Sequence, residues 1–140
     1  MNTAYIVDAS TVMKLFVEEP QSAEAFALFD QTNAGDIQLY APDLLYIECA
    51  NVFWKYTTRF GYRDEDAKRS LQLLASLPVK WVSVYELFGK AYSLAIEKNI
   101  TAYDACYLLL ARELDCSLVT ADRQLAEKDT AITWLGDYRH

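Results

Sequence analysis

The sequence of 140 residues contains a single histidine, and this histidine is the last residue, His140. Chain ends usually fray, so an imidazole at that position is poorly placed to act as a catalytic base. A Ser-His-Asp triad and an H-E-x-x-H zinc site both need histidines inside the folded part of a chain. The scarcity of histidine therefore argues against both chemistries. An enzyme with this sequence has to rely on carboxylates.

Cysteine is also scarce, and Cys49, Cys106 and Cys116 form no C-x-x-C pair. Each lies in an apolar stretch, where a free cysteine behaves as a small hydrophobic residue. We therefore expect three reduced core residues in a cytoplasmic protein, with no zinc site and no redox role.

Long apolar runs are missing as well. No run approaches the roughly 18 apolar residues that a membrane-spanning helix needs. The first residues, M-N-T-A-Y-I-V-D, do not combine a basic region with the apolar core of a secretion signal. Four glycines and three prolines leave little material for linkers, and the length fits one domain spanning residues 1–140. We expect a soluble protein with no membrane partner.

The apolar pattern alternates short runs with longer helical segments. It predicts strands at 4–7, 37–40, 80–84, 117–120 and 131–134. It predicts helices at 10–17, 21–34, 42–60, 64–76, 86–98, 101–114 and 122–128, with Pro42 in the first turn of the third. Strands that alternate with helices are typical of a parallel sheet covered on both faces. The predicted class is a three-layer α/β fold.

Four acidic residues stand where the pattern predicts buried neighbours. Asp8 follows the first strand directly, and Asp122 comes shortly after the fourth, so both lie at the edge of the sheet where ligands bind in open α/β folds. Glu48 falls on an apolar stripe of its helix, and Asp104 falls on the inward side of the first turn of another. Each acid alone has a structural explanation: ending a strand, capping a helix, or pairing with a basic residue.

Together the four acids suggest a shared site. Several carboxylates within a few ångströms of one another cannot all stay ionised unaided, because like charges raise each other's pKa. A bound divalent cation removes this conflict. Hard ions such as Mg²⁺ and Mn²⁺ prefer oxygen ligands and suit phosphate chemistry, because they polarise a phosphodiester and activate water without histidine.

The segments around the four acids resemble those of a known family. The segments V-D-A-S at 7–10, A-P-D-L-L-Y-I before Glu48, Y-D-A at 103–105 and T-A-D at 120–122 are similar to the acidic signature of PIN-domain ribonucleases. The similarity is greatest to the single-domain toxins of VapBC-type toxin–antitoxin pairs, and it spans about residues 4–134. It implies a five-stranded parallel sheet between helices and metal-dependent endonucleolytic cleavage of RNA.

The resemblance also implies roles for individual residues. It places Asp8, Glu48, Asp104 and Asp122 as catalytic residues and metal ligands around Mg²⁺ or Mn²⁺, with Asp8, Asp104 and Asp122 holding one ion. Glu48 would orient or deprotonate the attacking water, or bind a second ion. Supporting hydrogen bonds would come from Ser10 and Thr120. Members of this toxin class commonly form homodimers and bind a small antitoxin protein, so we expect both partners besides RNA.

The net charge of −7 argues against an extended basic groove for RNA. Basic and aromatic residues nevertheless gather between residues 53 and 69. Such a mixture can stack bases and contact phosphates, but aromatic residues at helical spacing are more often core or interface. We favour an interface with a second copy or an antitoxin over RNA contact; the candidates are Trp54, Lys55, Arg59 and Arg63.

Two other functions are weighed against the nuclease. A haloacid-dehalogenase-like phosphohydrolase would use Asp8 as a nucleophile in the segment Asp8-Ala9-Ser10-Thr11-Val12. Most such phosphatases need a second acid where this chain has Ser10, and Glu48 would have no role. The second alternative is a PIN-like scaffold without turnover, and the complete set of acids argues against it. The RNA target cannot be read from the sequence.

Overall fold

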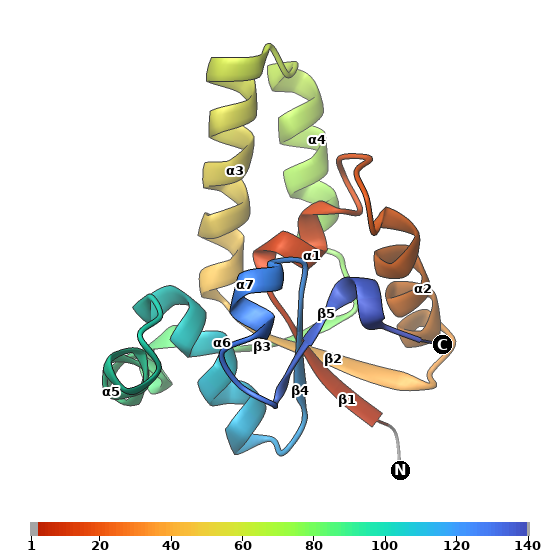
Figure 1. Ribbon diagram of the computed structural model, residues 1–140. Helices are drawn as coiled ribbons and strands as arrows, with labels where there is room; N and C mark the ends of the chain where they lie inside the picture. Colours follow the sequence, from red (N-terminus) through yellow and green to blue (C-terminus); the bar gives the residue numbers. More distant parts are fainter. Residues whose placement is uncertain (1–2, 140) are drawn as a thin grey trace.

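The computed structural model describes residues 3–139, so His140 lies outside the described residues. Five parallel strands form one sheet in the order β3-β2-β1-β4-β5 (Figure 1). The strands are β1 (Thr3–Val7), β2 (Ile37–Pro42), β3 (Val79–Val82), β4 (Ser117–Thr120) and β5 (Ile132–Trp134). The helices are α1 (Ala9–Met13), α2 (Ser22–Asn33), α3 (Leu44–Phe60), α4 (Asp64–Leu74), α5 (Phe88–Lys98), α6 (Ala102–Glu113) and α7 (Arg123–Ala126). Two short 3₁₀ helices, η1 (Val84–Glu86) and η2 (Leu135–Asp137), complete the fold.

The strand order reverses beside β1. The chain adds β2 and β3 on one side of β1 and then crosses over to add β4 and β5 on the other. Ile6 of β1 is aligned with Tyr40 of β2 and with Leu118 of β4, so β1 lies at the centre of the sheet. In such sheets the crevice at the carboxyl ends of the strands on either side of the reversal is the usual place for a ligand.

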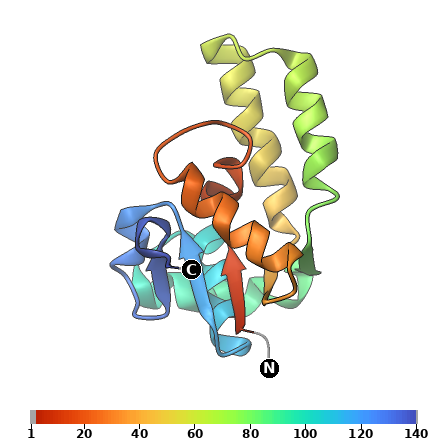
Figure 2. The ribbon, with the colours of Figure 1, turned by 90° about the vertical axis from the view of Figure 1, so that its right-hand side faces the viewer.

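Helices cover both faces of the sheet. Figures 1 and 2 show α2 on one face and α6 on the other. Every residue of α6 from 105 to 111 is buried, because this helix packs on β1, β2 and β4 and beneath α5. A helix that is apolar on all sides is typical of the centre of a core. The helices α3 and α4 pack against each other and extend beyond the carboxyl ends of the strands as an arm.

The five predicted strands are all present, but several boundaries were wrong, and the helix predicted at 10–17 already ends at Met13. Pro42 does not open α3; it is the last residue of β2 and aligns with Val82 of β3. The Asp43 N–H still donates to the Val82 carbonyl at 2.9 Å, so the chain stays extended up to that residue. β3 ends at Val82 rather than Val84, because the Ser83 hydroxyl accepts the Tyr85 N–H and starts η1. As a result, α5 begins at Phe88 instead of residue 86.

The expected burial of the cysteines holds for two of the three. Cys49 and Cys106 are buried, Cys116 is half-buried, and all three are free thiols. Across residues 3–139, none of the helices combines the length and the apolar character that a bilayer crossing requires.

Candidate active site

Asp8 lies at the carboxyl end of β1 and caps α1. Its carboxylate accepts three hydrogen bonds: from the Thr11 N–H at 3.0 Å, from the Ser10 hydroxyl at 2.7 Å and from the Thr120 hydroxyl at 2.5 Å. Only 5% of Asp8 is exposed. Burial raises the pKa of this carboxyl above its usual value, and the hydrogen bonds from Thr120, Ser10 and Thr11 oppose the rise.

Ser10 and Thr120 connect the ends of β1 and β4. Their hydroxyl oxygens are 3.2 Å apart. The Ser10 hydroxyl accepts the Ala121 N–H at 3.0 Å, and the Thr120 hydroxyl accepts the Asp122 N–H at 3.1 Å. This network ties the two strand ends together and holds the segment that carries Asp122 next to Asp8.

Asp122 caps the short helix α7. Its Oδ1 accepts the N–H groups of Gln124 at 3.0 Å and Leu125 at 3.2 Å. Asp122 therefore does cap a helix, which is one of the structural explanations given for this acid from the sequence. Both bonds go to the same oxygen, so capping and a role at the sheet edge are compatible.

Asp104 lies in the first turn of α6, where Thr101 is the N-cap and accepts the Asp104 N–H at 3.0 Å. Leu108 and Ala111, which share its side of the helix, are fully buried as expected. Burial, followed by the negative charges of Asp8 and Asp122, raises the pKa of Asp104 to about 6. The helix N-terminus thus does not compensate the charge of this acid.

Glu48 lies in the second turn of α3. The fully buried stripe of this helix runs through Leu45, Cys49 and Phe53, while Glu48 is half-buried at the border of the core. Burial raises the pKa of Glu48, a hydrogen bond from the Tyr107 hydroxyl at 2.6 Å opposes this rise, and the charges of nearby acids add to it. Those charges belong to Asp8 and Asp104.

The structure therefore brings the four predicted acids into one electrostatic field. Within residues 3–139, no lysine or arginine forms an ion pair with any of them. In the same part of the chain, no three acidic, cysteine or histidine side chains stand close enough to bind one ion together. Such a set of oxygen donors fits an ion that keeps several waters, as Mg²⁺ does, with one or two direct carboxylate ligands.

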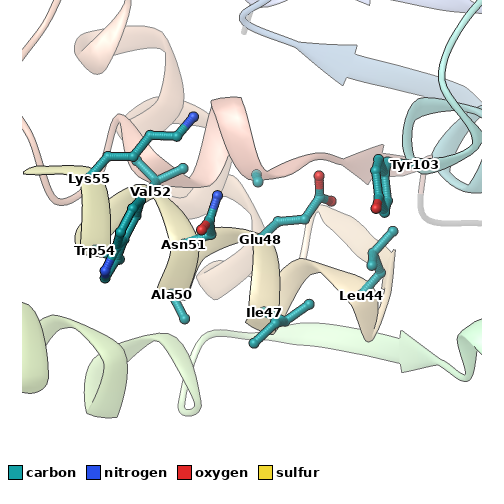
Figure 3. A pocket seen from close by; sticks show the side chains of 10 residues that line it. Leu44, Ile47, Glu48, Ala50, Asn51, Val52, Trp54, Lys55 and Tyr103 are labelled. Carbon is teal, nitrogen blue, oxygen red and sulfur yellow. The ribbon is translucent and has the colours of Figure 1, made fainter.

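A cavity of about 640 Å³ opens beside Glu48 (Figure 3). Tyr103 of α6 borders it at the Glu48 end, and Trp54 and Lys55 line it farther along α3. A second cavity of about 430 Å³ is lined by Asp104 and Asp122. Glu48 thus borders one open space, and Asp104 and Asp122 border another.

The four residues named as interface or RNA candidates are not all brought together. Trp54 and Lys55 line the cavity with Glu48. The Arg59 guanidinium stacks over the Trp54 ring, 5.6 Å from its centroid. Arg63 lies at the start of α4 and pairs with Glu65 at 3.4 Å, away from the cavity.

Sequence reasoning missed Tyr107 and Tyr103, which both approach Glu48 from α6. A signal for Tyr107 was present, because it follows Asp104 by three residues and therefore lies on the same side of the helix. Its meaning depends on tertiary structure, because only the fold brings the Tyr107 hydroxyl of α6 to Glu48 of α3.

The fold and the four acids define a parallel α/β protein with an uncompensated acidic site at the point where the strand order reverses. The PIN domain family matches residues 5–131, and the chain belongs to this family. The sequence-based identification and the predicted fold class are both confirmed.

Known proteins agree with this membership. Ribonuclease VapC3 of Pyrobaculum aerophilum is 36% identical over 129 residues, which cover 91% of this chain and 95% of the relative. The crystal structure of PAE2754, also from Pyrobaculum aerophilum, has a TM-score of 0.72 at 27% identity, covering 96% of this chain and 92% of that one. A toxin–antitoxin complex from Klebsiella pneumoniae matches with a TM-score of 0.66 over 92% and 95% of the chains; at 15% identity it supports the fold alone.

Proposed function

We propose that this protein is an endoribonuclease that hydrolyses RNA phosphodiester bonds with Mg²⁺ or Mn²⁺, and that it is the toxin of a toxin–antitoxin pair. The observation that carries the proposal is the set of acids at the sheet edge: the charge of Asp8 helps to raise the pKa values of Glu48 and Asp104, and none of the four acids pairs with a lysine or arginine in the described chain. The ribonuclease name of the Pyrobaculum relative supports the same activity.

Asp8, Asp104 and Asp122 would hold the ion, directly or through its waters. When bound, the ion would supply Lewis-acid activation of the phosphodiester and of water. The residues of the chain prepare this site beforehand. Ser10 and Thr120 fix the carboxylate of Asp8, so that it does not have to reorganise when a ligand arrives.

Glu48 would orient the attacking water and take up its proton. The raised pKa of this carboxyl makes it a better base than an ordinary exposed glutamate. The sequence favours a protein interface for Lys55 and Trp54, but both line the cavity beside Glu48, so we assign them instead to a phosphate and a base of the RNA. Hydrolysis would leave one fragment with a phosphate and the other with a hydroxyl.

The phosphohydrolase alternative requires Asp8 to attack phosphorus. Both Asp8 oxygens already accept hydrogen bonds, Oδ1 from Ser10 and Thr11 and Oδ2 from Thr120, and the side chain is buried. A carboxylate bound in this way is a better ligand or anchor than a nucleophile. The scaffold alternative predicts that purified protein neither binds Mn²⁺ nor cleaves RNA.

The test is RNA cleavage by purified wild type and by Asp8→Asn, each with Mn²⁺ and with EDTA. We expect cleavage only by wild type with Mn²⁺, and the exposed Asp36→Asn serves as a matched control that keeps activity. Cleavage that persists in Asp8→Asn or in EDTA would refute a metal-dependent site built on this residue.

We also propose a second copy of this chain and a small antitoxin as partners in the cytoplasm. The outer side of α5 and the preceding η1 exposes Phe88, Tyr92, Ile96 and Tyr85, each between 61% and 79% accessible. These four side chains offer on the order of 500 Å² of apolar surface, a large part of the ~800 Å² that each partner contributes to a standard interface. Tyr92 lies near the middle of this row of four apolar side chains. The same row on a second copy of α5, running antiparallel, could therefore pack against it.

Sedimentation of wild type and of Tyr92→Glu tests the dimer. We expect a dimer for wild type and a monomer for the variant, whose exposed position should leave the fold unchanged; a dimer in both would show that another surface is used. Co-purification with the product of an adjacent small reading frame, together with loss of RNA cleavage in that complex, tests the antitoxin.

A further inference from the structure

Tyr107 is an almost fully buried tyrosine that the mechanism above does not use. Only 1% of it is exposed, and its ring lies in the core beneath the acidic site. Its hydroxyl donates to Glu48 Oε1 at 2.6 Å, a bond that links α6 to α3 across 59 positions of sequence. A buried phenol needs such a partner, because an unpaired hydroxyl in the core is costly.

The bond matters because, among the described residues, no other side chain donates a hydrogen bond to the Glu48 carboxylate. A glutamate has three rotatable side-chain bonds and loses considerable freedom when it is held in one place. Asp8 is held by Ser10, Thr11 and Thr120, all from the strand ends. Among the hydrogen bonds of the described residues, Tyr107 supplies the one to the Glu48 carboxylate. The Tyr107 ring is held in place because the core encloses it.

The geometry also distinguishes the two Glu48 oxygens. Oε1 is taken by the Tyr107 hydroxyl, so Oε2 is left for a water or an ion. Asp104 lies one turn before Tyr107 on the same helix. The helix α6 therefore contributes one acid of the site and also the donor that holds the acid contributed by α3.

We propose that Tyr107 is a positioning residue of the nuclease site: it fixes the Glu48 carboxylate through Oε1 and thereby presents Oε2 to a water bound to the ion. This inference rests on the proposed function, because the ligand presented to Oε2 belongs to that function. Tyr107 itself touches neither substrate nor ion.

The test is Mn²⁺ binding by titration calorimetry, which does not depend on RNA cleavage. Removing the hydroxyl in Tyr107→Phe keeps the ring in the core, and we expect Mn²⁺ affinity to fall about 10–100-fold, the loss typical when an outer-shell partner of a metal site is removed. Tyr40→Phe is the matched control, since it removes a tyrosine hydroxyl that donates to Gln38 Oε1 at 3.1 Å and contacts none of the four acids, and it should bind Mn²⁺ like wild type.

A double-mutant cycle separates positioning from a general effect on the fold. In a Glu48→Ala background the Tyr107→Phe change should cost no further Mn²⁺ affinity, because there is no carboxylate left to position. An equal loss in both backgrounds would mean that Tyr107 acts through packing, and would overturn the inference. Wild-type affinity in Tyr107→Phe would also overturn it.

Glu48→Asp tests the same geometry if Tyr107→Phe does not fold. It leaves Tyr107 in place and withdraws the carboxylate by one methylene from the hydroxyl, at a half-buried position. We expect a loss of Mn²⁺ affinity comparable to that of Tyr107→Phe, and unchanged affinity would contradict the inference. If the wild-type protein neither binds Mn²⁺ nor cleaves RNA, the proposed function fails and this inference fails with it. If the wild-type protein does both, and Tyr107→Phe binds Mn²⁺ with the same affinity, only the role of Tyr107 is refuted.

Discussion

Carboxylates at two places in this protein are largely removed from solvent, but their negative charges are compensated at only one of the two places. The side chain of Asp129 is only 10% exposed, and it pairs with Lys98 at 3.1 Å and with Arg112 at 2.8 Å. Burial alone would raise its pKa, but hydrogen bonds from Ala131, Arg112 and Lys98 outweigh burial and lower the pKa to about 2. At the sheet edge, Asp8, Glu48 and Asp104 have raised pKa values and no basic partner in the described chain.

The contrast shows that the chain has the means to neutralise a shielded acid and does not use them at the sheet edge. Ionised acids that raise one another's pKa make the folded state less stable at neutral pH. Such a cost is expected where the compensating charge comes from outside the chain, as it does in a metal site. Asp129 and its two basic partners stabilise the fold, whereas under the proposed function the four acids are reserved for a ligand.

Asp104→Asn should give the largest change, and in two opposite directions. RNA cleavage should fall by more than the ~10–100-fold that is typical for loss of a supporting residue, because a ligand itself is lost. The free energy of unfolding of the metal-free protein should rise by about 1–2 kcal/mol at pH 7.5, a value discounted from the pKa shift for partial exposure. Cleavage assays and urea unfolding of both proteins measure the two effects.

The gain in stability should depend on pH in a defined window. The folded protein binds more protons than the unfolded chain between pH 3.8 and about 6, because the pKa of Asp104 is raised over that range. Wild-type stability should therefore fall as pH rises through this window, and the advantage of Asn should be full above it and absent below it. A constant difference between the proteins from pH 3.5 to 8 would contradict the raised pKa.

Asp129→Asn should lower the free energy of unfolding by about 2 kcal/mol at pH 7 and leave cleavage by the folded protein unchanged. The direction is the reverse of that for Asp104, because the pKa of Asp129 is lowered from 3.8 to about 2. The contribution of Asp129 should be present above pH 4 and disappear as pH falls through 2. Equal stabilities of wild type and variant at pH 7 would remove the contrast between the two groups.

Lys55→Ala should have the smallest effect and should act on RNA binding. Lys55 lines the cavity next to Glu48, so its loss should weaken binding to an inactive Asp8→Asn background several-fold and reduce the slope of log affinity against log salt by about 1. Arg63→Ala is the matched control: this residue pairs with Glu65 away from the cavity and should leave both values unchanged. Equal effects of the two substitutions would indicate a diffuse charge effect.

Much of the fold could be predicted because the sequence records it locally. The alternation of apolar runs and helical segments gave the five strands, and Asp8 and Asp122 were predicted at strand ends because each follows an apolar run closely. Pro42 was misplaced, because a proline that opens a helix and one that ends a strand look alike without the partner strand. The start of α5 was predicted two residues too early, also because the partner strand was unknown. The turn at Ser83, which precedes α5, depends on where β3 ends.

The sequence by itself limited the chemistry that this protein can use: with one histidine in 140 residues and four acids beside apolar runs, it leaves carboxylates as the candidate catalytic groups. Only the tertiary structure decided how the acids are supported. Which hydroxyl meets which carboxylate depends on contacts between residues 112 positions apart, in the case of Thr120 and Asp8, or 59 apart, for Tyr107 and Glu48. Local patterns carry no record of such pairs, because they form only when packed helices and strand ends bring distant segments together.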